Sequence, residues 1–272
     1  MDIKTLAYRV KAWLRHQLTA RNSGGHGIHS PYLFEWVRMV MNDPHRFYAW
    51  DKIEQVHEHL LSDERELVFV DYGSGAAVKG EERVLKVCDI AKTSLSKKKY
   101  AQMLARLVNW LGTSDRPETR SLTIVELGTS LGITTAYLAA MDSRNKVVTY
   151  EGCSAVSSIA RETWKALGIR NIDCRVGEIQ VDVLSADLQQ VDVAFVDANH
   201  TYAGTRAYLN ILLEKVHAKS VIVIDDIHYS PAMEQAWREI CADERVTSSM
   251  DLYQMGMLFF DPHFWKRHYV LN

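Results

Sequence analysis

The sequence predicts an α/β protein with a doubly wound sheet, preceded by a mostly helical N-terminal extension. Between Leu122 and Asp225, apolar runs of strand length alternate with helix-like patterns, which favours parallel strands with helices on both faces of the sheet. The first run, residues 122–127, leads through a glycine turn directly into a helical pattern, the layout of a ligand-binding loop. The chain of 272 residues is long enough for one large domain and an extension.

The extension begins with a predicted amphipathic helix. Residues 2–20 carry apolar side chains at helical spacing, and lysine and arginine occupy the opposite face. A basic amphipathic helix can bind a membrane surface or an acidic partner, but a docked helix with a solvated basic face is the commoner case, and we expect it here. A second helix is predicted over residues 31–41. The glycine-rich loop between the two helices contains His26 and His29 and has the flexibility of a substrate lid.

A second strand-then-glycine pattern, residues 66–75, rivals the first as a cofactor loop. No strand ending in an acid follows it; a charged stretch and a helical pattern come instead, so we reject it as the cofactor site. A helix over residues 96–111, ended by Gly112, completes the extension. A polar, proline-containing segment then predicts the domain boundary, with residues 1–118 as an extension that acts as a substrate lid and residues 119–272 as the core.

The composition favours an intracellular enzyme. The chain is 47% hydrophobic and 24% charged, which is typical of globular proteins. A formal charge of −2 and a pI near 6.6 leave no general basic field, so nucleic acid is not favoured as a partner. Four cysteines without metal-site spacing are typical of reduced thiols. No apolar run approaches the ~20 residues of a membrane span and no signal-peptide core is present, so we expect a cytoplasmic location.

The glycine loop does not have the chemistry of a phosphate site. Gly128 and Gly132 would let the backbone turn sharply and approach a ligand, and the helix opening near Leu131 would direct free N–H groups towards it. Glu126 would repel a phosphate, however, and no Gly-Lys-Ser/Thr follows. The spacing G-T-S-L-G also lacks the dinucleotide pattern. A nucleoside with a positive centre beside its ribose fits best.

The segment E-L-G-x-x-x-G, formed by Glu126, Leu127, Gly128 and Gly132, resembles the loop of class I S-adenosylmethionine (SAM)-dependent methyltransferases. The chain is similar in particular to the catechol O-methyltransferase-like branch and to bacterial sugar and natural-product O-methyltransferases. Further segments follow in the family's order at residues 147–151, 171–180, 191–200 and 221–228. The resemblance implies a Rossmann-like sheet of seven strands, parallel except for an antiparallel edge pair within residues 246–260.

The resemblance implies SAM as the cofactor and identifies its contacts. Glu151 ends the second strand about 20 residues after the loop, where an acid would bind the ribose hydroxyls. The implied cofactor-binding residues are Glu126, Gly128, Thr129, Ser130, Gly132, Thr134, Glu151, Gly152, Gly177, Gln180 and Asp197.

The resemblance also implies the catalytic groups. Methyl transfer from a sulfonium needs an aligned nucleophile and removal of its proton. Metal-dependent relatives hold a divalent ion at the ends of the fourth and fifth strands, which implies Asp197, Asp225 and Asp226 as ligands for a hard ion such as Mg²⁺. The alternative is that these acids only end strands and cap helices. His200 and His228 are nearly equal candidates for the general base, and each could instead cap a helix.

The function implied is transfer of a methyl group from SAM to a hydroxyl of a small-molecule acceptor. Two alternatives stay open. One is methylation of a protein or another macromolecule, and the other is a non-catalytic SAM-binding module. The sequence does not identify the acceptor and leaves the oligomeric state open, a homodimer included.

Overall fold

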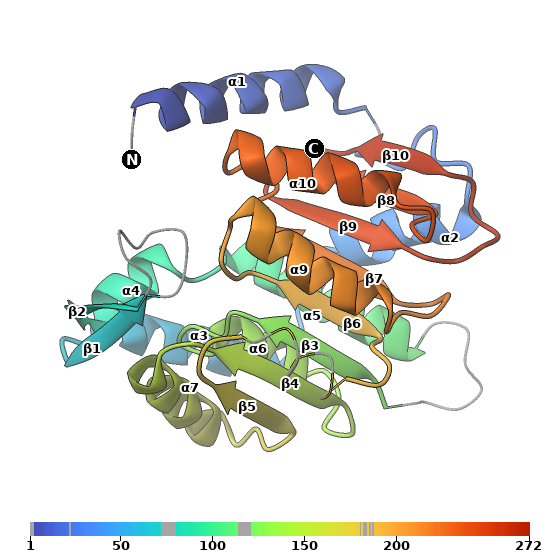
Figure 1. The fold of residues 1–272 in the computed structure, drawn as a ribbon. Helices are drawn as coiled ribbons and strands as arrows, with labels where there is room; N and C mark the ends of the chain where they lie inside the picture. Colours follow the sequence, from blue (N-terminus) through green and yellow to red (C-terminus); the bar gives the residue numbers. More distant parts are fainter. Residues whose placement is uncertain are drawn as a thin grey trace. The chain divides into compact units, whose positions relative to one another are not determined.

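Figure 1 shows a computed structural model of the chain, which describes residues 3–21, 23–71, 80–113, 121–179, 181, 184, 186 and 188–272. The chain forms two compact units, one of residues 1–42 with 181–272 and the other of residues 43–180. These limits differ from the predicted division after residue 118, which falls outside the described residues. The division into an extension and a core therefore stays a prediction.

The unit of residues 43–180 contains the strand–loop–helix segment from which the fold was predicted. Its parallel strands are β3 (Thr123–Leu127), β4 (Lys146–Glu151) and β5 (Ile172–Val176), with β4 in the middle. Its helices are α3 (Ala49–Leu61), α4 (Val87–Thr93), α5 (Lys98–Thr113), α6 (Ile133–Ala139) and α7 (Ser154–Leu167). Strands and helices alternate here as the apolar runs predicted. Helix α5 does not end before Gly112 but includes it.

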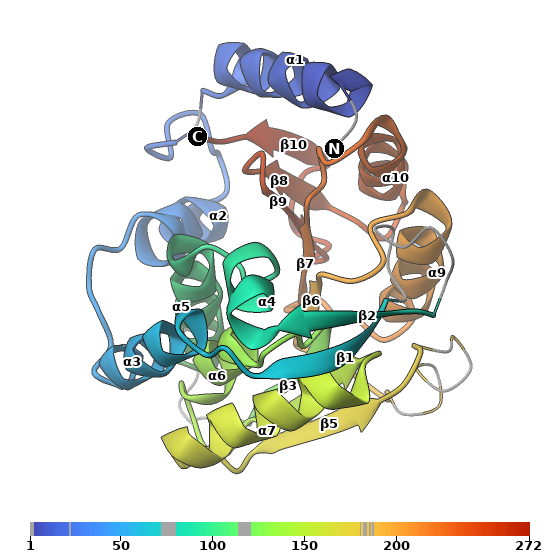
Figure 2. The ribbon, with the colours of Figure 1, turned by 90° about the vertical axis from the view of Figure 1, so that its left-hand side faces the viewer.

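An antiparallel hairpin of β1 (Glu66–Asp71) and β2 (Glu81–Lys86) also belongs to this unit. Strand β2 was not expected, because its charged sequence gave no strand pattern. The pairing explains it. Leu67 and Leu85 face each other and pack against the core, whereas Val68 and Val84 face each other and are exposed. Strand β1 lies beside α7 (Figure 2), and residues 72–79, which include the end of the rejected loop, lie outside the described residues.

The other unit carries the C-terminal strands. In sheet order they are β6 (Val193–Val196), β7 (Val221–Asp225), β9 (Met255–Phe259), β8 (Ser248–Asp251) and β10 (Arg267–Val270). Strands β6 and β7 are parallel, and β9 is antiparallel to both β7 and β8, so the antiparallel edge pair is confirmed. Strand β10, parallel to β8, is a strand beyond the predicted seven.

Helices cover both faces of this second set of strands. They are α2 (Pro31–Trp36) with a π-helical continuation (Val37–Met41), α9 (Tyr202–Leu213) and α10 (Pro231–Ala242), whereas α1 (Ile3–Thr19) lies at the edge of these strands, beyond β10. Residues 256 and 259 of β9 point to opposite faces. A Cβ at Gly256 would lie 2.6 Å from Trp237 of α10, and Trp36 of α2 packs against Phe259 with ring centroids 5.8 Å apart. Figure 2 shows α10 and α2 on the two sides of these strands.

Helix α1 docks through its polar face, which corrects the expected orientation. His16 is buried and its Nε2 lies 2.8 Å from the carbonyl oxygen of Leu271, while Arg15 pairs with Glu234 at 2.7 Å. The apolar side chains expected to pack inward are 47–81% exposed; they are Leu6, Val10, Trp13, Leu14 and Leu18. Specific polar partners therefore decide which face docks. None of the helices within the described ranges has the length and hydropathy of a membrane span.

The glycine-rich loop after α1 is held to the C-terminus of the chain. The N–H of Arg21 donates to the carbonyl of Val270 (3.1 Å), and the N–H of Asn272 donates to Oγ of Ser23 (2.9 Å). Gly25 has a φ of 83° and packs closely, because a Cβ there would lie 2.7 Å from the ring of Phe34. The lid role of this loop stays a prediction.

Candidate cofactor and catalytic sites

The loop after β3 is fastened to the end of β4. The N–H groups of Gly128 and Thr129 both donate to the carbonyl of Tyr150, at 3.0 and 3.1 Å. Gly128 has a φ of 99° and Ser130 a φ of 49°, so the chain turns back on itself in a conformation that side chains disfavour. This turn directs the N–H of Ser130 towards Glu151.

Glu151 is held by backbone donors on both of its carboxylate oxygens. The N–H of Ser130 donates to Oε2 (2.8 Å), and the N–H of Cys153 donates to Oε1 (2.9 Å). Burial raises the pKa of Glu151, although the hydrogen bonds from Cys153, Ser130 and Gly152 oppose that shift. A carboxylate has about four lone-pair sites, so these backbone donors leave part of its acceptor capacity free. The carboxylate is thus fixed in orientation and still able to accept a hydrogen bond from a ribose hydroxyl. Gly177, with a φ of 123°, donates its N–H to the Glu151 carbonyl (2.8 Å).

Glu126 is buried inside the same unit, where it joins β3 to its neighbours. Its Oε2 accepts from the hydroxyls of Thr135 (2.5 Å) and Thr149 (2.6 Å), and Thr149 also contacts Thr129 (2.6 Å). Thr134 is nearly buried as well. We therefore assign Glu126 to the support of the loop, and a direct cofactor contact by this acid stays a prediction. Gln180 lies outside the described residues.

Gly132 has a packing role that the sequence did not predict, and its contact with the cofactor stays a prediction. Its φ is 79°, and a Cβ would lie 2.6 Å from Nε1 of Trp164 and 2.9 Å from Cβ of Ala160. The indole N–H of Trp164 donates to the carbonyl of Gly132 (2.8 Å). Helix α7 is therefore a close neighbour of Gly132. Sequence reasoning missed Trp164, and its only signal was its place on the apolar face of the helix.

In the unit of residues 1–42 and 181–272, the three predicted metal ligands interact with one another. Burial raises the pKa of Asp225 well above its usual range, and the charges of Asp197 and Asp226 add to that shift. Oδ1 of Asp225 is buried without a hydrogen-bond partner among the described residues. Asp226 accepts a hydrogen bond from Nε2 of Gln254 (2.5 Å), a contact that the sequence did not predict. Crowded carboxylates of this kind need a cation or shared protons to offset their repulsion.

These acids fit a hard divalent ion. A buried carboxylate oxygen without a partner, beside two further carboxylates, is the donor set that Mg²⁺ prefers. The backbone here is also held in a disfavoured conformation, since Asn199, His200 and Asp226 all have φ between 41° and 69°. Such strain is concentrated at functional sites.

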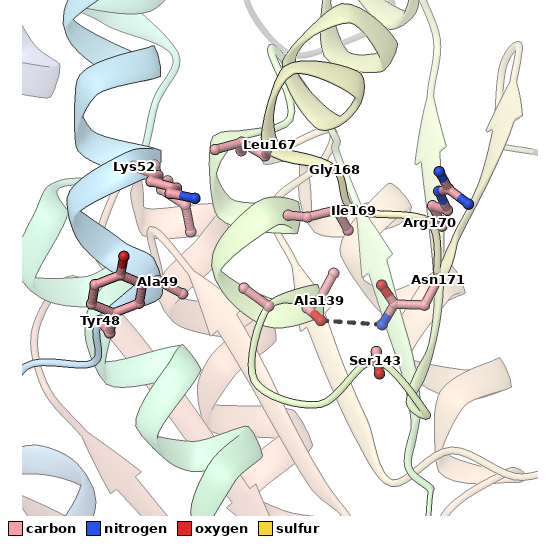
Figure 3. A pocket seen from close by; sticks show the side chains of 12 residues that line it. Tyr48, Ala49, Lys52, Ala139, Ser143, Leu167, Gly168, Ile169, Arg170 and Asn171 are labelled. Carbon is pink, nitrogen blue, oxygen red and sulfur yellow. Dashed lines mark hydrogen bonds between the residues drawn. The ribbon is translucent and has the colours of Figure 1, made fainter.

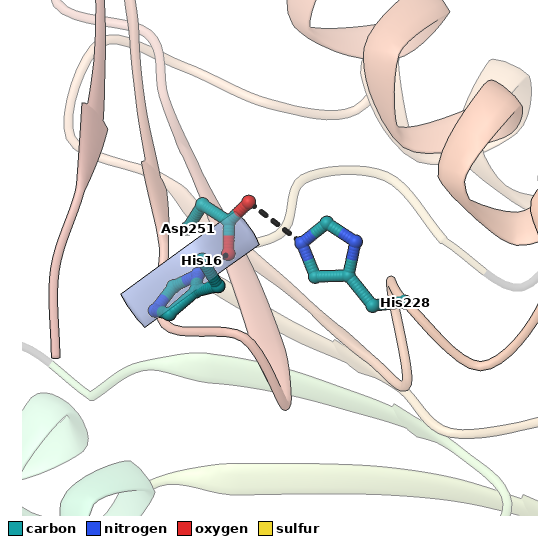
Figure 4. Close-up of side chains that lie close together, drawn as sticks. All are labelled: His16, His228 and Asp251. Carbon is teal, nitrogen blue, oxygen red and sulfur yellow. Dashed lines mark hydrogen bonds and ion pairs between the residues drawn. The ribbon is translucent and has the colours of Figure 1, made fainter. Parts of the chain in front are cut away.

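The two candidate general bases lie in different surroundings. Nε2 of His200 lies 3.3 Å from Oδ1 of Asp197. Burial would lower the pKa of His200, but the hydrogen bond to Asp197 and the charges of Asp197 and Asp226 outweigh it and raise the pKa. His228 instead contacts Asp251 through Nε2 (2.8 Å) and lies beside His16 (Figure 4). Of the two, His200 is the one in contact with the predicted metal ligands.

A cavity of about 580 Å³ (Figure 3) lies near the amino ends of β4 and β5, whereas Glu151 lies at the carboxyl end of β4. It is lined by Tyr48 and Lys52 of the α3 region and by residues 167–171, which lead into the amino end of β5. Asn171 closes one side by donating to the carbonyl of Ala139 (3.1 Å). None of the predicted site residues lines this cavity, so we do not assign the cofactor to it.

Part of the chain matches a known protein family. Residues 125–227 match a family described as a methyltransferase domain. No curated protein matches the chain.

Solved structures similar to the chain include several methyltransferases. A protein from Klebsiella pneumoniae assigned as an O-methyltransferase is 14% identical, with 82% of this chain and 94% of that one covered and a TM-score of 0.56. The O-methyltransferase from Bacillus cereus, in complex with SAH, is 17% identical, with 84% and 97% covered and a TM-score of 0.54. TomG of Streptomyces achromogenes, an O-methyltransferase of tomaymycin synthesis in complex with SAM, is 18% identical, with 61% and 81% covered and a TM-score of 0.51. These likenesses confirm the predicted fold class.

Proposed function

We propose that the chain transfers the methyl group of SAM to a hydroxyl of a small molecule, because residues 125–227 match a methyltransferase domain and solved O-methyltransferases share the fold. The observation that supports this proposal most is the contact of His200 with Asp197, in a group of acids with Asp225 and Asp226. Such a group suits removal of a proton from a hydroxyl, a step that a module serving only to bind SAM would not need.

We assign the ribose of SAM to Glu151, whose carboxylate is oriented by the N–H groups of Ser130 and Cys153. SAM supplies the activated methyl group. The loop of residues 128–130 shapes the backbone around the cofactor, since its N–H groups and φ angles are set by bonds to β4. This part of the chain therefore binds and orients, and it takes no part in moving the proton.

Asp197, Asp225 and Asp226 would hold Mg²⁺, which would make a bound hydroxyl more acidic. His200 would take the proton, with Asp197 orienting its imidazole. We prefer His200 to His228 because His228 is engaged with Asp251. Without an ion, the same acids would share protons, and His200 would remain the base.

The test is methyl transfer from labelled SAM to a panel of hydroxylated small molecules, with added Mg²⁺ and with a chelator. Label in small acceptors supports the proposal, and label only in added protein favours the macromolecular alternative. Binding of SAM without transfer to any class favours the non-catalytic module. We also propose that the protein acts in the cytoplasm, which its four free cysteines support.

Replacing Glu151 by Ala should weaken S-adenosylhomocysteine binding by about 10- to 150-fold, because charge-assisted hydrogen bonds are worth about 1.5–3 kcal/mol. Calorimetry measures this change. Glu162→Ala is the matched control, since Glu162 is an exposed acid of α7 in the same unit. Equal effects of the two substitutions would contradict the role of Glu151.

Binding of S-adenosylhomocysteine should also weaken as the pH falls, because burial raises the pKa of Glu151. The carboxylate of Glu151 accepts hydrogen bonds from the ribose hydroxyls fully only when it is charged, because protonation turns one of its oxygens into a donor. Because burial raises its pKa, protonation starts at a higher pH than the ordinary value of about 4.3. Affinity should therefore be full at neutral pH and fall on acidification before an ordinary glutamate would titrate. A flat affinity down to about pH 4 would contradict this assignment.

A further inference from the structure

A second cluster of metal-ligand side chains lies where α1 meets β8 and the end of β7 (Figure 4). His16, His228 and Asp251 are 3%, 8% and 5% exposed, and one ligand atom of each lies within 4.8 Å of the others. Nδ1 of His16 is 3.3 Å from Oδ1 of Asp251. Two ligands held about 2.0–2.1 Å from a tetrahedral Zn²⁺ lie about 3.3 Å apart, so this spacing suits such an ion.

The hydrogen bond between His16 and Leu271 determines which nitrogen of the His16 imidazole carries a proton. The carbonyl of Leu271 can only accept, so Nε2 of His16 carries a proton and donates it (2.8 Å). In neutral His16, Nδ1 is then a bare acceptor, and it faces the carboxylate of Asp251. No hydrogen-bond partner for Nδ1 exists among the described residues. Two acceptors in a buried site at this distance need either a proton on Nδ1 of His16 or a metal ion between them.

Nδ1 of His228 is likewise a buried acceptor without a donor in the described part of the chain when the imidazole is neutral. Its Nε2 lies 2.8 Å from Oδ2 of Asp251 and so carries the proton, which leaves Nδ1 bare and 3.8 Å from Oε2 of Glu234. Nδ1 of His228 also has no hydrogen-bond partner among the described residues. A metal ion on Nε2 would move the proton to Nδ1, where Glu234 could accept it. Metal-bound histidines usually donate their outer N–H to a carboxylate or carbonyl. Leu271 is such an acceptor for His16, and Glu234, 3.8 Å from Nδ1 of His228, would become one for His228 by a small movement of its side chain.

We propose that His16, His228 and Asp251 form a binding site for a divalent transition-metal ion such as Zn²⁺, whose ligands are separate from the Asp197, Asp225 and Asp226 group. Two imidazoles and a carboxylate suit Zn²⁺ better than Mg²⁺, which prefers oxygen ligands. Asp251 is fixed in place because the N–H of Tyr253 donates to its Oδ1 (2.8 Å). The ion would fasten α1 to the C-terminal strands.

The surroundings leave one coordination position open. A cavity of about 370 Å³ adjoins the three ligands, and Arg15, Glu234, Cys241 and His268 also line it. Glu234 is already paired with Arg15 and accepts from the hydroxyl of Tyr8, so it serves as an outer acceptor. Burial raises the pKa of Cys241 to about 12, so this side chain stays a thiol at neutral pH. Water or a small exogenous ligand would complete a tetrahedral site.

The experiment uses the full chain, stripped of metal by a chelator and titrated with Co²⁺, which reports tetrahedral coordination by visible absorption. We expect one ion per chain, displacement by Zn²⁺, and a rise in the unfolding midpoint of roughly 5–10 °C at a free Zn²⁺ concentration about 100 times Kd. His16→Gln should lose all three signals. His217→Gln should keep them, because His217 forms an ordinary pair with Asp192 (3.0 Å) in the same unit.

An unfolding midpoint of metal-free His16→Gln close to that of the metal-free wild type would show that this variant is folded. If it does not fold, X-ray absorption of the wild type with Zn²⁺ decides the question, and two imidazole ligands are expected. No Co²⁺ binding by the wild type, unchanged binding by His16→Gln, or coordination by oxygen alone would each overturn the proposal. If the wild type does not bind Co²⁺, protons on the imidazoles of His16 and His228 would instead offset the negative charge of the neighbouring carboxylates.

Discussion

Replacing Asp225 by Asn should lower methyl transfer by about 100-fold or more while changing SAM affinity little. The substitution keeps the shape of the side chain and removes one negative charge from the group with Asp197 and Asp226. That charge is what a divalent ion would need, and the buried Oδ1 of Asp225 has no other hydrogen-bond partner among the described residues. The measurement is kcat with an acceptor found in the panel, beside the Kd of SAM.

Asp243→Asn is the matched control for this prediction. Asp243 is also an acid in the same unit, but it pairs with Arg245 at the end of α10 and belongs to no predicted site. The Asp243→Asn substitution should leave kcat unchanged. Exhaustive chelation of the wild type should have an effect similar to Asp225→Asn. Full activity of the wild type after chelation would show that no ion is needed and that His200 alone takes the proton. If Asp225→Asn lost as much SAM affinity as activity, Asp225 would instead be assigned to the cofactor.

The sheet could be predicted because its strands are buried on both faces. Parallel strands covered by helices read as continuous apolar runs, and β3, β4, β6 and β7 were found within a few residues of their ends. Strands β2 and β10 gave no such signal. Arg267 and His268 of β10 are exposed, and only Tyr269 of this strand is buried, so the segment becomes a strand only through its pairing with β8. The local sequence does not reveal strand pairing of this kind.

The candidate site was predictable where its residues end strands. Glu151 and Asp197 follow apolar runs directly, and the family pattern assigns them. The cluster of His16 with Asp251 could not be found in this way, because the two residues are far apart in the chain and share no spacing motif. The periodic pattern of α1 even pointed to the wrong face, since the apolar side chains are exposed and His16 is buried. Long-range polar contacts overrode the local pattern.

Replacing Gly132 by Ala should destabilise the unit of residues 43–180 by about 2–5 kcal/mol. Two costs add together. The residue has a φ of 79°, which an L side chain rarely adopts, and the new Cβ would lie 2.6 Å from the Trp164 indole and 2.9 Å from Ala160. Relief requires movement of α7 or of the loop, and either movement breaks the Trp164 hydrogen bond to the Gly132 carbonyl. Urea unfolding measures the change in free energy.

Gly168→Ala separates the two costs. Gly168 ends α7 with a φ of 70°, but a Cβ there would meet nothing within 4 Å, so its substitution carries only the backbone cost of about 1–2 kcal/mol. Gly132→Ala should exceed it, and truncation of Trp164 to Ala in the Gly132→Ala background should cost less than the same truncation in the wild type. Because the loop of residues 128–130 precedes Gly132, binding of S-adenosylhomocysteine should weaken in Gly132→Ala and not in Gly168→Ala. Equal losses of stability in the two glycine variants would show that α7 yields to the methyl group, and that Gly132 is required only for its turn.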